Sequence, residues 1–410
     1  MREGLTCPSR LRIVGRFETT QAGKAARTGI SSSLETGQVH SPAGTTRHRT
    51  ISIARSVEAV EALRPAWEEL RGSVVATDPE WCTAVLDVLP GAGRPHVVTL
   101  ESRTGVDAIA VGNLRTRPVP CKLGGRAVYS PKVPTISIVE DGFLGNVGAD
   151  NATMLVGELV ATLDRREADP CLLLHLPATS PVRDAIHAEV GLARRAHGER
   201  LEKRWSRSIP DSYDEFLASV SRRMRKGLRQ ARRRVEMQFG ARLTLRSLRR
   251  AVEADELIRE ADSVARLTYQ RKIGVGFHDT RLTRWSVREA ARRGLLRAWV
   301  LYLDERPIAF DWGIAYNRTF RWVAGGFDPA HADHRPGWYL MGRAIEALCE
   351  DVDVGRIDFG LGDGEYKRRL GCTYELEGDA LLAAARPRAL WVASAYTATD
   401  LATRAYYAVR

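Results

Sequence analysis

The sequence predicts two tandem α/β domains, each built on a mixed and mostly antiparallel sheet flanked by helices. The chain of 410 residues is longer than one ordinary hydrophobic core supports. Hydrophobic residues make up 44% of it and charged residues 27%, which is typical of a globular protein. One order of predicted elements occurs twice along the chain: helices, an antiparallel meander, a crossing helix and a parallel strand. This repeat of order, without sequence identity between the halves, indicates the tandem arrangement.

Three segments are expected. Residues 1–50 are rich in Ser, Thr, Gly and Arg and show no apolar period, which predicts a disordered basic tail. A first domain over 51–205 and a second over 206–410, ending in a C-terminal helix, follow. No apolar run approaches the roughly 20 residues that span a bilayer, and the N-terminus lacks the apolar core of a secretory signal. These patterns favour a soluble, cytoplasmic protein.

Capping residues mark the helices of the first domain. Ser56 can cap a helix that runs to about Arg71, and Asp78-Pro79 opens a second helix. Strands are expected at HVVTLE and VDAIAVGNL, with shorter pieces near 128 and 136. A helix over about 151–165, the buried strand CLLLHL, a helix opened by Ser180-Pro181 and a strand near residue 200 complete the domain.

The second domain repeats this order. Two helices are expected over about 212–236, then the strand ARLTLRSL and two more helices within 250–293. The strands RAWVLYL, PIAFDWGIAY and TFRWVAGGF form a meander with turns at 304–306 and at Asn317-Arg318. A helix from Gly337, the strand RIDFG, a Gly-rich loop, further strand to about residue 385 and a closing helix follow.

The start of the helix at Gly337 is the first candidate site. Amides at a helix N-terminus, with a cation beside them, form a site for phosphate or pyrophosphate. We therefore expect cofactor binding by Arg335, Pro336, Gly337 and Trp338, with Asp328 in the preceding loop contacting substrate. The alternative is that Pro-Gly merely turns the chain. His331 and His334 form an HxxH in a loop, which lacks helical spacing, so no metal site is expected.

The segment RIDFGLGDGEYKRRLG, from Arg356, is the second candidate. It matches neither the P-loop nor the dinucleotide pattern, which excludes both sites. A strand ends at Asp358, and polar side chains follow in a Gly-rich loop at its carboxyl end. Asp358 is the candidate base and Tyr366 the candidate acid. Asp363, Lys367 and Arg368 are expected to bind substrate. The alternative is a tight structural turn with solvated charges.

The third candidate is the basic run RRMRKGLRQARRR at 222–234. It holds eight cationic and no acidic side chains. Together with the tail it accounts for the whole net charge of +12, so the rest of the chain is close to neutral. Arg225 and Arg229 lie on neighbouring turns of one helix, where they can meet phosphates of a coenzyme, a nucleotide or tRNA. A solvated helix face is the alternative.

Residues from about 212 to 371 resemble a GNAT-type acetyltransferase family associated with bacterial cellulose and exopolysaccharide biosynthesis, the CelD-like group. The resemblance lies in YDEFLASVSRRMRKGLRQARRRVE, GGFDPAHADHRPGWYLMGRAIEAL and DFGLGDGEYKRRLG, of which the last is the most specific. The opening of the first domain, DPEWCTAVLDVL with its strands, is similar to the degenerate N-terminal GNAT-like half of such proteins. The tandem arrangement also resembles Fem-type transferases, which move amino acids from aminoacyl-tRNA onto peptidoglycan precursors.

The resemblance implies acyl-CoA as the donor, no metal, and coenzyme pyrophosphate at the helix from Gly337. His334, Gly337 and Tyr339 stand where the GNAT pyrophosphate loop has Arg or Gln, Gly, and Gly or Ala; another activated acyl donor therefore stays open. The implied acceptor is an amine or hydroxyl of a small-molecule, cell-envelope or glycan precursor. An aminoacyl-tRNA-dependent transferase, or a non-catalytic nucleic-acid binder, is the alternative.

Overall fold

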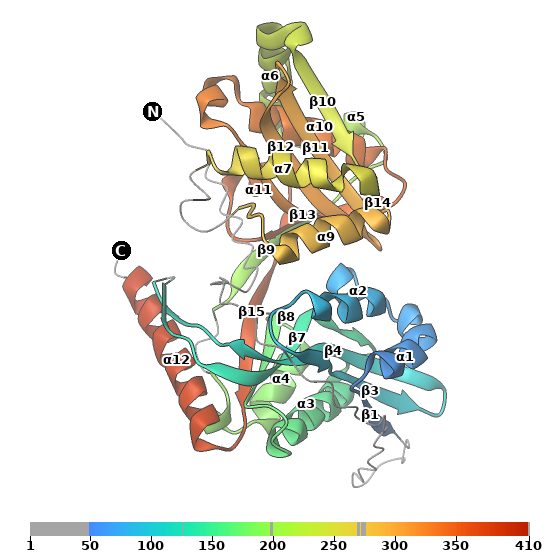
Figure 1. Cartoon of the computed structure of the whole chain (residues 1–410), viewed down its shortest axis with the longest axis vertical. Coiled ribbons are helices and arrows are strands. Elements are labelled where there is room, and N and C mark those ends of the chain that lie inside the picture. Colours follow the sequence, from blue (N-terminus) through green and yellow to red (C-terminus); the bar gives the residue numbers. More distant parts are fainter. Residues whose placement is uncertain (1–48, 125, 197–199, 269–270, 272–275, 409–410) are drawn as a thin grey trace. The chain divides into compact units, whose positions relative to one another are not determined.

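The computed structural model describes residues 49–124, 126–196, 200–268, 271 and 276–408, and these form two compact units (Figure 1). The first unit holds residues up to Leu201 and from Glu377 onward; the second holds Glu202–Leu376. The expected boundary near 205 lies close to this division. The predicted tail over 1–50 falls, except for its last two residues, outside the described residues.

The C-terminal helix α12 (Pro387–Ala408) belongs to the first unit, whereas we expected it in the second domain. The reason is the long strand β15 (Thr373–Ala383), which belongs to the second unit only as far as Leu376. From Glu377 onward, β15 pairs antiparallel with β8 (Pro170–Pro177) of the first unit. The chain therefore returns to the first unit within this strand. This pairing joins segments about 200 residues apart in sequence and has no local sequence signal.

In the first unit the sheet order is β1 (Thr50–Ala54), β3 (Val97–Ser102), β4 (Gly105–Pro118), β7 (Lys132–Gly145), β8 and β15. β2 (Gly93–Pro95) pairs with β4, while β5 (Cys121–Leu123) and β6 (Arg126–Tyr129) form a separate ribbon. The helices are α1 (Val57–Glu69), α2 (Pro79–Ala84), α3 (Ala149–Asp164) and α4 (Pro181–Glu189). The Ser56 hydroxyl accepts from the amide of Ala59, and Asp78 accepts from that of Trp81, which confirms both predicted caps.

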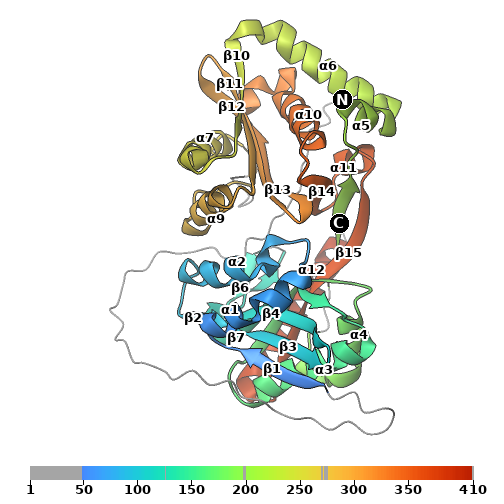
Figure 2. The same cartoon turned by 90° about the vertical axis from the view of Figure 1, so that its right-hand side faces the viewer.

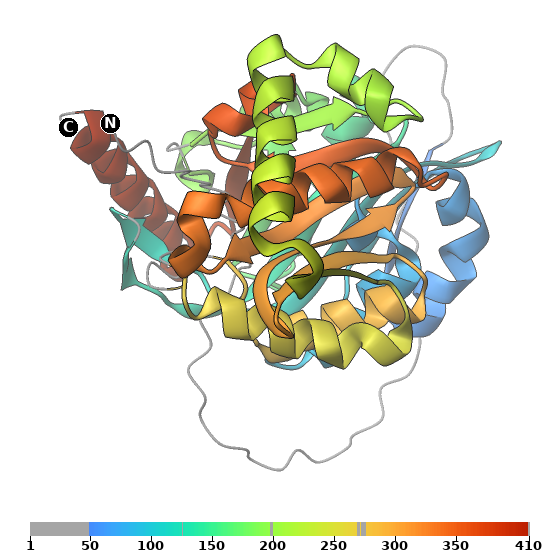
Figure 3. The same cartoon turned by 90° about the horizontal axis from the view of Figure 1, so that it is seen from above.

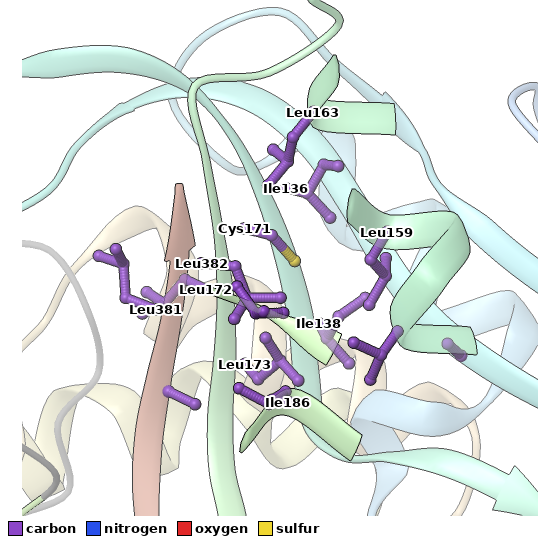
Figure 4. Packing of buried hydrophobic residues seen from close by; sticks show 14 of the residues in the cluster. Ile136, Ile138, Leu159, Leu163, Cys171, Leu172, Leu173, Ile186, Leu381 and Leu382 are labelled. Atoms are coloured by element: carbon purple, nitrogen blue, oxygen red, sulfur yellow. The ribbon is translucent and has the colours of Figure 1, made fainter. Parts of the chain in front are cut away.

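The core of the first unit lies between its sheet and the helices α3 and α4 (Figure 4). The apolar run in β8 is buried because β7 and β15 flank it in the sheet and helices cover it. Leu159 and Leu163 of α3 lie on the same side as Ile136 and Ile138 of β7, and Ile186 of α4 lies beside Leu173 of β8 (Figure 4). Burial on both faces explains why three leucines follow one another at the start of this strand.

In the second unit the order is β15, β9 (Glu202–Ser208), β14 (Val354–Leu361), β13 (Arg318–Phe327), β12 (Arg306–Tyr316), β11 (Leu296–Leu303) and β10 (Leu243–Leu248). Helices α7 (Ala254–Ala265) and α9 (Arg281–Arg292) cover one face, and α5 (Tyr213–Ser219), α6 (Arg222–Phe239) and α10 (Pro336–Cys349) the other (Figure 2). Helix α6 lies against α10 (Figure 3), burying one apolar stripe made of Met224, Leu228, Ala231, Val235 and Phe239.

The repeated element order is confirmed. The meander β3-β4-β7 is followed by α3 and by β8, which pairs parallel with β7. The meander β11-β12-β13 is followed by α10 and by β14, which pairs parallel with β13. One segment differs, because Glu365–Arg369 of the expected loop forms the short helix α11. Among the described residues, no helix is both long and apolar enough to cross a membrane.

Candidate functional site

The central feature of the second unit is the point where β13 and β14 separate. Their parallel pairing covers only Arg318–Arg321 of β13 and Val354–Asp358 of β14. β13 then continues to Phe327, still paired on its other edge with β12. From Trp322 onward one edge of β13 therefore has no partner strand among the described residues. Unpaired backbone groups inside a sheet can bind an extended ligand that carries amides of its own.

Three aromatic side chains connect the separated elements. The indole of Trp322 on β13 stacks on Phe359 of β14, with ring centroids 5.6 Å apart and planes at 17°. Phe359 in turn meets the ring of Tyr366, on α11, edge to face at 6.2 Å. Tyr366 is half-buried. The tyrosine singled out in the sequence is thus near the separation of the strands, and its role as an acid stays a prediction.

Asp311 of β12 is a residue that the sequence analysis missed. Its Oδ1 accepts a hydrogen bond from Trp322 Nε1 at 3.0 Å. It lies opposite Gly325 on β13, where a Cβ atom would come within 1.8 Å of Oδ1, so only glycine fits there. Burial raises the pKa of Asp311 well above its usual range, which favours the protonated form of the carboxyl. The available signal was a lone carboxylate within the apolar strand PIAFDWGIAY.

The start of α10 lies directly after β13 and the short helix η6 (Pro329–His334). Arg335 is exposed and in the left-handed conformation, with φ 59°, and no side chain caps the helix. The amide of Gly337 has no partner among the described residues, while those of Trp338 and Tyr339 both donate to the carbonyl of Arg335. The four predicted cofactor residues, Arg335 to Trp338, therefore surround an uncapped helix N-terminus with one unused amide and one cation.

Asp358 stands in the last parallel pair before the strands separate, but its oxygens are engaged. Oδ2 accepts from Arg204 Nη2 at 2.6 Å and from Nε at 3.1 Å, and Oδ1 accepts from the amide of Gly360 at 2.8 Å. The side chain is 3% exposed. This buried ion pair joins β9 to β14, and removing either partner would leave the other charge buried without compensation. These contacts speak against the predicted role of Asp358 as a base.

The prediction that Lys367 binds substrate is wrong. The side chain is fully buried, and Nζ donates to four successive carbonyls at 2.9–3.2 Å, those of Phe359, Gly360, Leu361 and Gly362. The helix α11 turns the lysine inward, so that it satisfies the backbone of the Gly-rich turn. Lys367 is a structural residue that holds this turn at the end of β14.

The remaining predicted substrate residues have local partners. Asp363 is exposed and forms ion pairs with Lys203 and Arg368, both at 3.2 Å. Asp328 accepts from the amide of Ala330 and so caps η6, and Arg225 donates to the carbonyl of Ala218 at the end of α5. Asp328 and Arg225 therefore have structural roles. Among the described residues no group of three potential metal ligands occurs.

A basic stripe on α6 consists of Arg222, Lys226, Arg229 and Arg233. These side chains are exposed, and their spacing places them along one side of the helix. None forms an ion pair with a described residue, whereas the neighbouring Arg232 pairs with Glu236 and Glu346. The two predicted phosphate contacts on this helix are Arg225 and Arg229. Of these two, Arg229 is free to bind a ligand.

A groove of about 410 Å³ lies elsewhere, between α7 and α9. It is lined mainly by charged side chains, and its carboxylates already have cationic partners. Asp262 pairs with Arg266 at 2.6 Å, and Asp255 pairs with Arg288 at 2.9 Å. The separation of β13 and β14 offers unpaired backbone and a buried acid with a raised pKa, which this groove lacks, and is the better candidate.

Comparison with known proteins agrees with this fold. Residues 222–368 match the family model of an acetyltransferase (GNAT) domain. The structure is similar to FemX (TM-score 0.56, 10% identity, 82% of this chain and 98% of that chain) and to a conserved protein of unknown function from Bacteroides thetaiotaomicron (0.52, 10%, 81% and 99%). A tandem GNAT protein from the clavulanic acid biosynthesis pathway aligns with a TM-score of 0.49 at 13% identity over 82% of this chain and 99% of that chain. No curated protein matches. Residues 222–368 are therefore similar to a GNAT acetyltransferase domain, and the fold of the chain is similar to that of FemX.

Proposed function

We propose that the second unit transfers an acyl group from acyl-CoA, acetyl-CoA in the simplest case, to an amine or hydroxyl of a cell-envelope or polysaccharide precursor. The observation that carries the proposal is the separation of β13 from β14 immediately before the uncapped start of α10. The amides of the pantetheine arm pair with the free edge of β13. The coenzyme phosphates lie at the Gly337 amide and the Arg335 guanidinium. The acceptor class rests on the resemblance to the CelD-like group.

The chemistry assigns different tasks to the two ionisable groups beside the separation. The acceptor attacks the thioester carbonyl, the C–S bond breaks, and the acceptor's proton ends on the coenzyme thiol. Asp311, protonated and 8% exposed, donates a hydrogen bond to the oxyanion that develops on the carbonyl. Tyr366 protonates the leaving thiolate and then recovers a proton from the acceptor, so that the net transfer is from the acceptor to the thiol. This role of Asp311 as a hydrogen-bond donor differs from the role of base that we first expected for Asp358.

Acetyl-CoA binding tests the donor. The ligand should raise the midpoint of thermal unfolding, by an amount equivalent to about 2.7 kcal/mol at a hundred times its Kd. Arg335→Asn removes the cation but keeps a residue that tolerates the left-handed backbone, and it should weaken binding about 3–10-fold. Arg318→Asn is the matched control, because Arg318 is also exposed with a φ of 59° but starts β13 at its other end. No stabilisation of the wild type by acetyl-CoA would remove the proposal.

The second candidate is an aminoacyl-tRNA-dependent transferase, favoured by the basic stripe on α6 and by the Fem-type fold. If all four side chains of the stripe neutralise phosphates, the slope of log K against log salt should be about −3 to −4. Charge removal at Arg229 and Arg233 should then reduce that slope by about half. RNA binding with this slope, together with no response to acetyl-CoA, would favour this second candidate.

A further inference from the structure

Two arginines of the first unit are buried without a counter-ion. Arg115 and Arg117 stand two residues apart on β4, so their side chains leave the same face of the sheet. They are 6% and 3% exposed. Neither forms an ion pair with a described residue. Burial lowers the pKa of both guanidinium groups, to about 10 for Arg117, where repulsion from Arg115 adds to the effect.

Arg183 and Arg297, the other buried arginines among the described residues, are satisfied by the protein itself. Arg183 donates to three backbone carbonyls at 2.9–3.3 Å, those of Leu176, Pro177 and Gly378. Arg297 pairs with the carboxylates of Asp351 and Asp353. By contrast, Arg115 and Arg117 make one hydrogen bond each, to the Pro90 carbonyl and the Ser137 hydroxyl, and Arg115 Nε is buried without a partner. Most of their ten N–H donors are therefore unused.

The surroundings of the two arginines are polar. Thr135 lies opposite Arg115 on β7, and Ser137 lies opposite Asn113, so all of these side chains share one face of the β4–β7 pair. Asn113 is 6% exposed, and its Oδ1 is buried without a hydrogen-bonding partner. We call Asn113, Arg115, Arg117, Thr135 and Ser137 the β4–β7 polar row. A row of this kind inside a sheet contributes no apolar burial and contains two charges that cost free energy.

We propose that the β4–β7 polar row binds a phosphate group of a small phosphorylated ligand. Two arginines whose Cα atoms lie about 6.6 Å apart along one face of a strand can both direct their guanidinium forks at a tetrahedral dianion, with hydroxyl and amide groups beside it. No acidic member of the row competes for the cations. Asp379, whose charge acts on Arg117, is not within ion-pair distance of it. The bound anion would compensate the burial of both charges.

This site lies in the first unit and goes beyond the acyl-transfer function proposed for the second. The proposed phosphate site can be tested by isothermal titration calorimetry of the full-length chain with inorganic phosphate, pyrophosphate and acetate at constant ionic strength. We expect phosphate or pyrophosphate to bind one site, and Arg115→Gln and Arg117→Gln each to weaken that binding at least about 10-fold. Arg103→Gln, which removes the same charge from the exposed β3–β4 turn, should change nothing. Arg335→Asn should also leave phosphate binding intact, which separates this site from the acyl-donor site.

The ligand-free variants give a second readout. Because each substitution removes an uncompensated buried charge, the thermal midpoint of Arg117→Gln without phosphate should equal or exceed that of the wild type. If this variant does not fold, Arg117→Lys keeps the charge, and it should still lose at least about 10-fold in phosphate affinity because it lacks the bidentate fork. The proposal fails if phosphate and pyrophosphate do not bind, or if their binding survives in both glutamine variants. It also fails if acetate binds as tightly as phosphate.

Discussion

Replacing Asp311 by asparagine tests the claim that a neutral carboxyl lies beside the separation of β13 and β14. The amide oxygen can still accept from Trp322 Nε1, so the packing is preserved while the titrating proton is removed. In the folded protein, burial raises the pKa of Asp311 above its ordinary value of 3.8. The contribution of this group to stability is therefore complete below pH 3.8 and is lost as the pH rises toward the folded-state pKa.

The magnitude follows from the proton that the folded state retains. Between pH 3.8 and the folded-state pKa, the unfolding free energy of the wild type falls relative to Asp311→Asn by up to about 1.4 kcal/mol per pH unit. Over the two pH units from 5 to 7, this slope limits the relative gain of the variant to at most about 2.7 kcal/mol. Urea unfolding at pH 5, 6 and 7 measures this difference directly.

Asp304→Asn is the matched control. Asp304 has a φ of 48°, which asparagine tolerates, and its hydrogen bond from Arg242 lowers its pKa below 3.8. It is therefore ionised in both states from pH 5 to pH 7, and its variant should differ from the wild type by a constant amount. A difference for Asp311→Asn that stays flat over the same range would refute the neutral carboxyl and the role in the oxyanion site that rests on it.

Three further predictions follow from other contacts of the second unit. Lys367→Met should lower the unfolding free energy by about 3 kcal/mol or more, because four carbonyls lose a buried hydrogen-bond donor. Urea unfolding measures this loss, and a value below about 1 kcal/mol would contradict the prediction. Gly325→Ala should destabilise by more than about 2 kcal/mol, because its Cβ would overlap Asp311, whereas Gly227→Ala, with open space in α6, should stabilise by up to about 1 kcal/mol. Tyr366→Phe should reduce acyl transfer about 100-fold with acetyl-CoA affinity unchanged, and a loss of affinity instead would assign Tyr366 to donor binding.

The Gly337 position illustrates where sequence reasoning about the site was incomplete. Its place at the start of a helix was predicted correctly, and we expected it only to take part in cofactor binding. In the structure a Cβ at this position would lie 2.9 Å from the ring of Phe327, so any larger residue also disturbs the packing of α10 on β13. Arg335 is the better position for the binding test because its side chain is exposed.

The sequence by itself determined the tandem α/β order, the helix caps at Ser56 and Asp78, and the helix start beside Arg335. Each of these depends on residues within a few positions of one another: a capping hydroxyl or carboxylate, a Pro-Gly step, or an apolar period. The similarity of residues 222–368 to a GNAT domain was also visible in local motifs.

Only the tertiary structure decided which polar groups are free to act. The sequence predicted Lys367 and Asp358 as site residues. In the structure, Lys367 donates hydrogen bonds to four carbonyls of its own turn, and Asp358 pairs with Arg204, which is about 150 positions away. Asp311 reads as an isolated acid in an apolar strand, and its importance depends on Trp322 and Gly325 of the next strand. The path of β15 back to the first unit depends likewise on its pairing with β8. Burial and long-range pairing set the charge state and the partners of a side chain, and neither is encoded in the residues beside it in sequence.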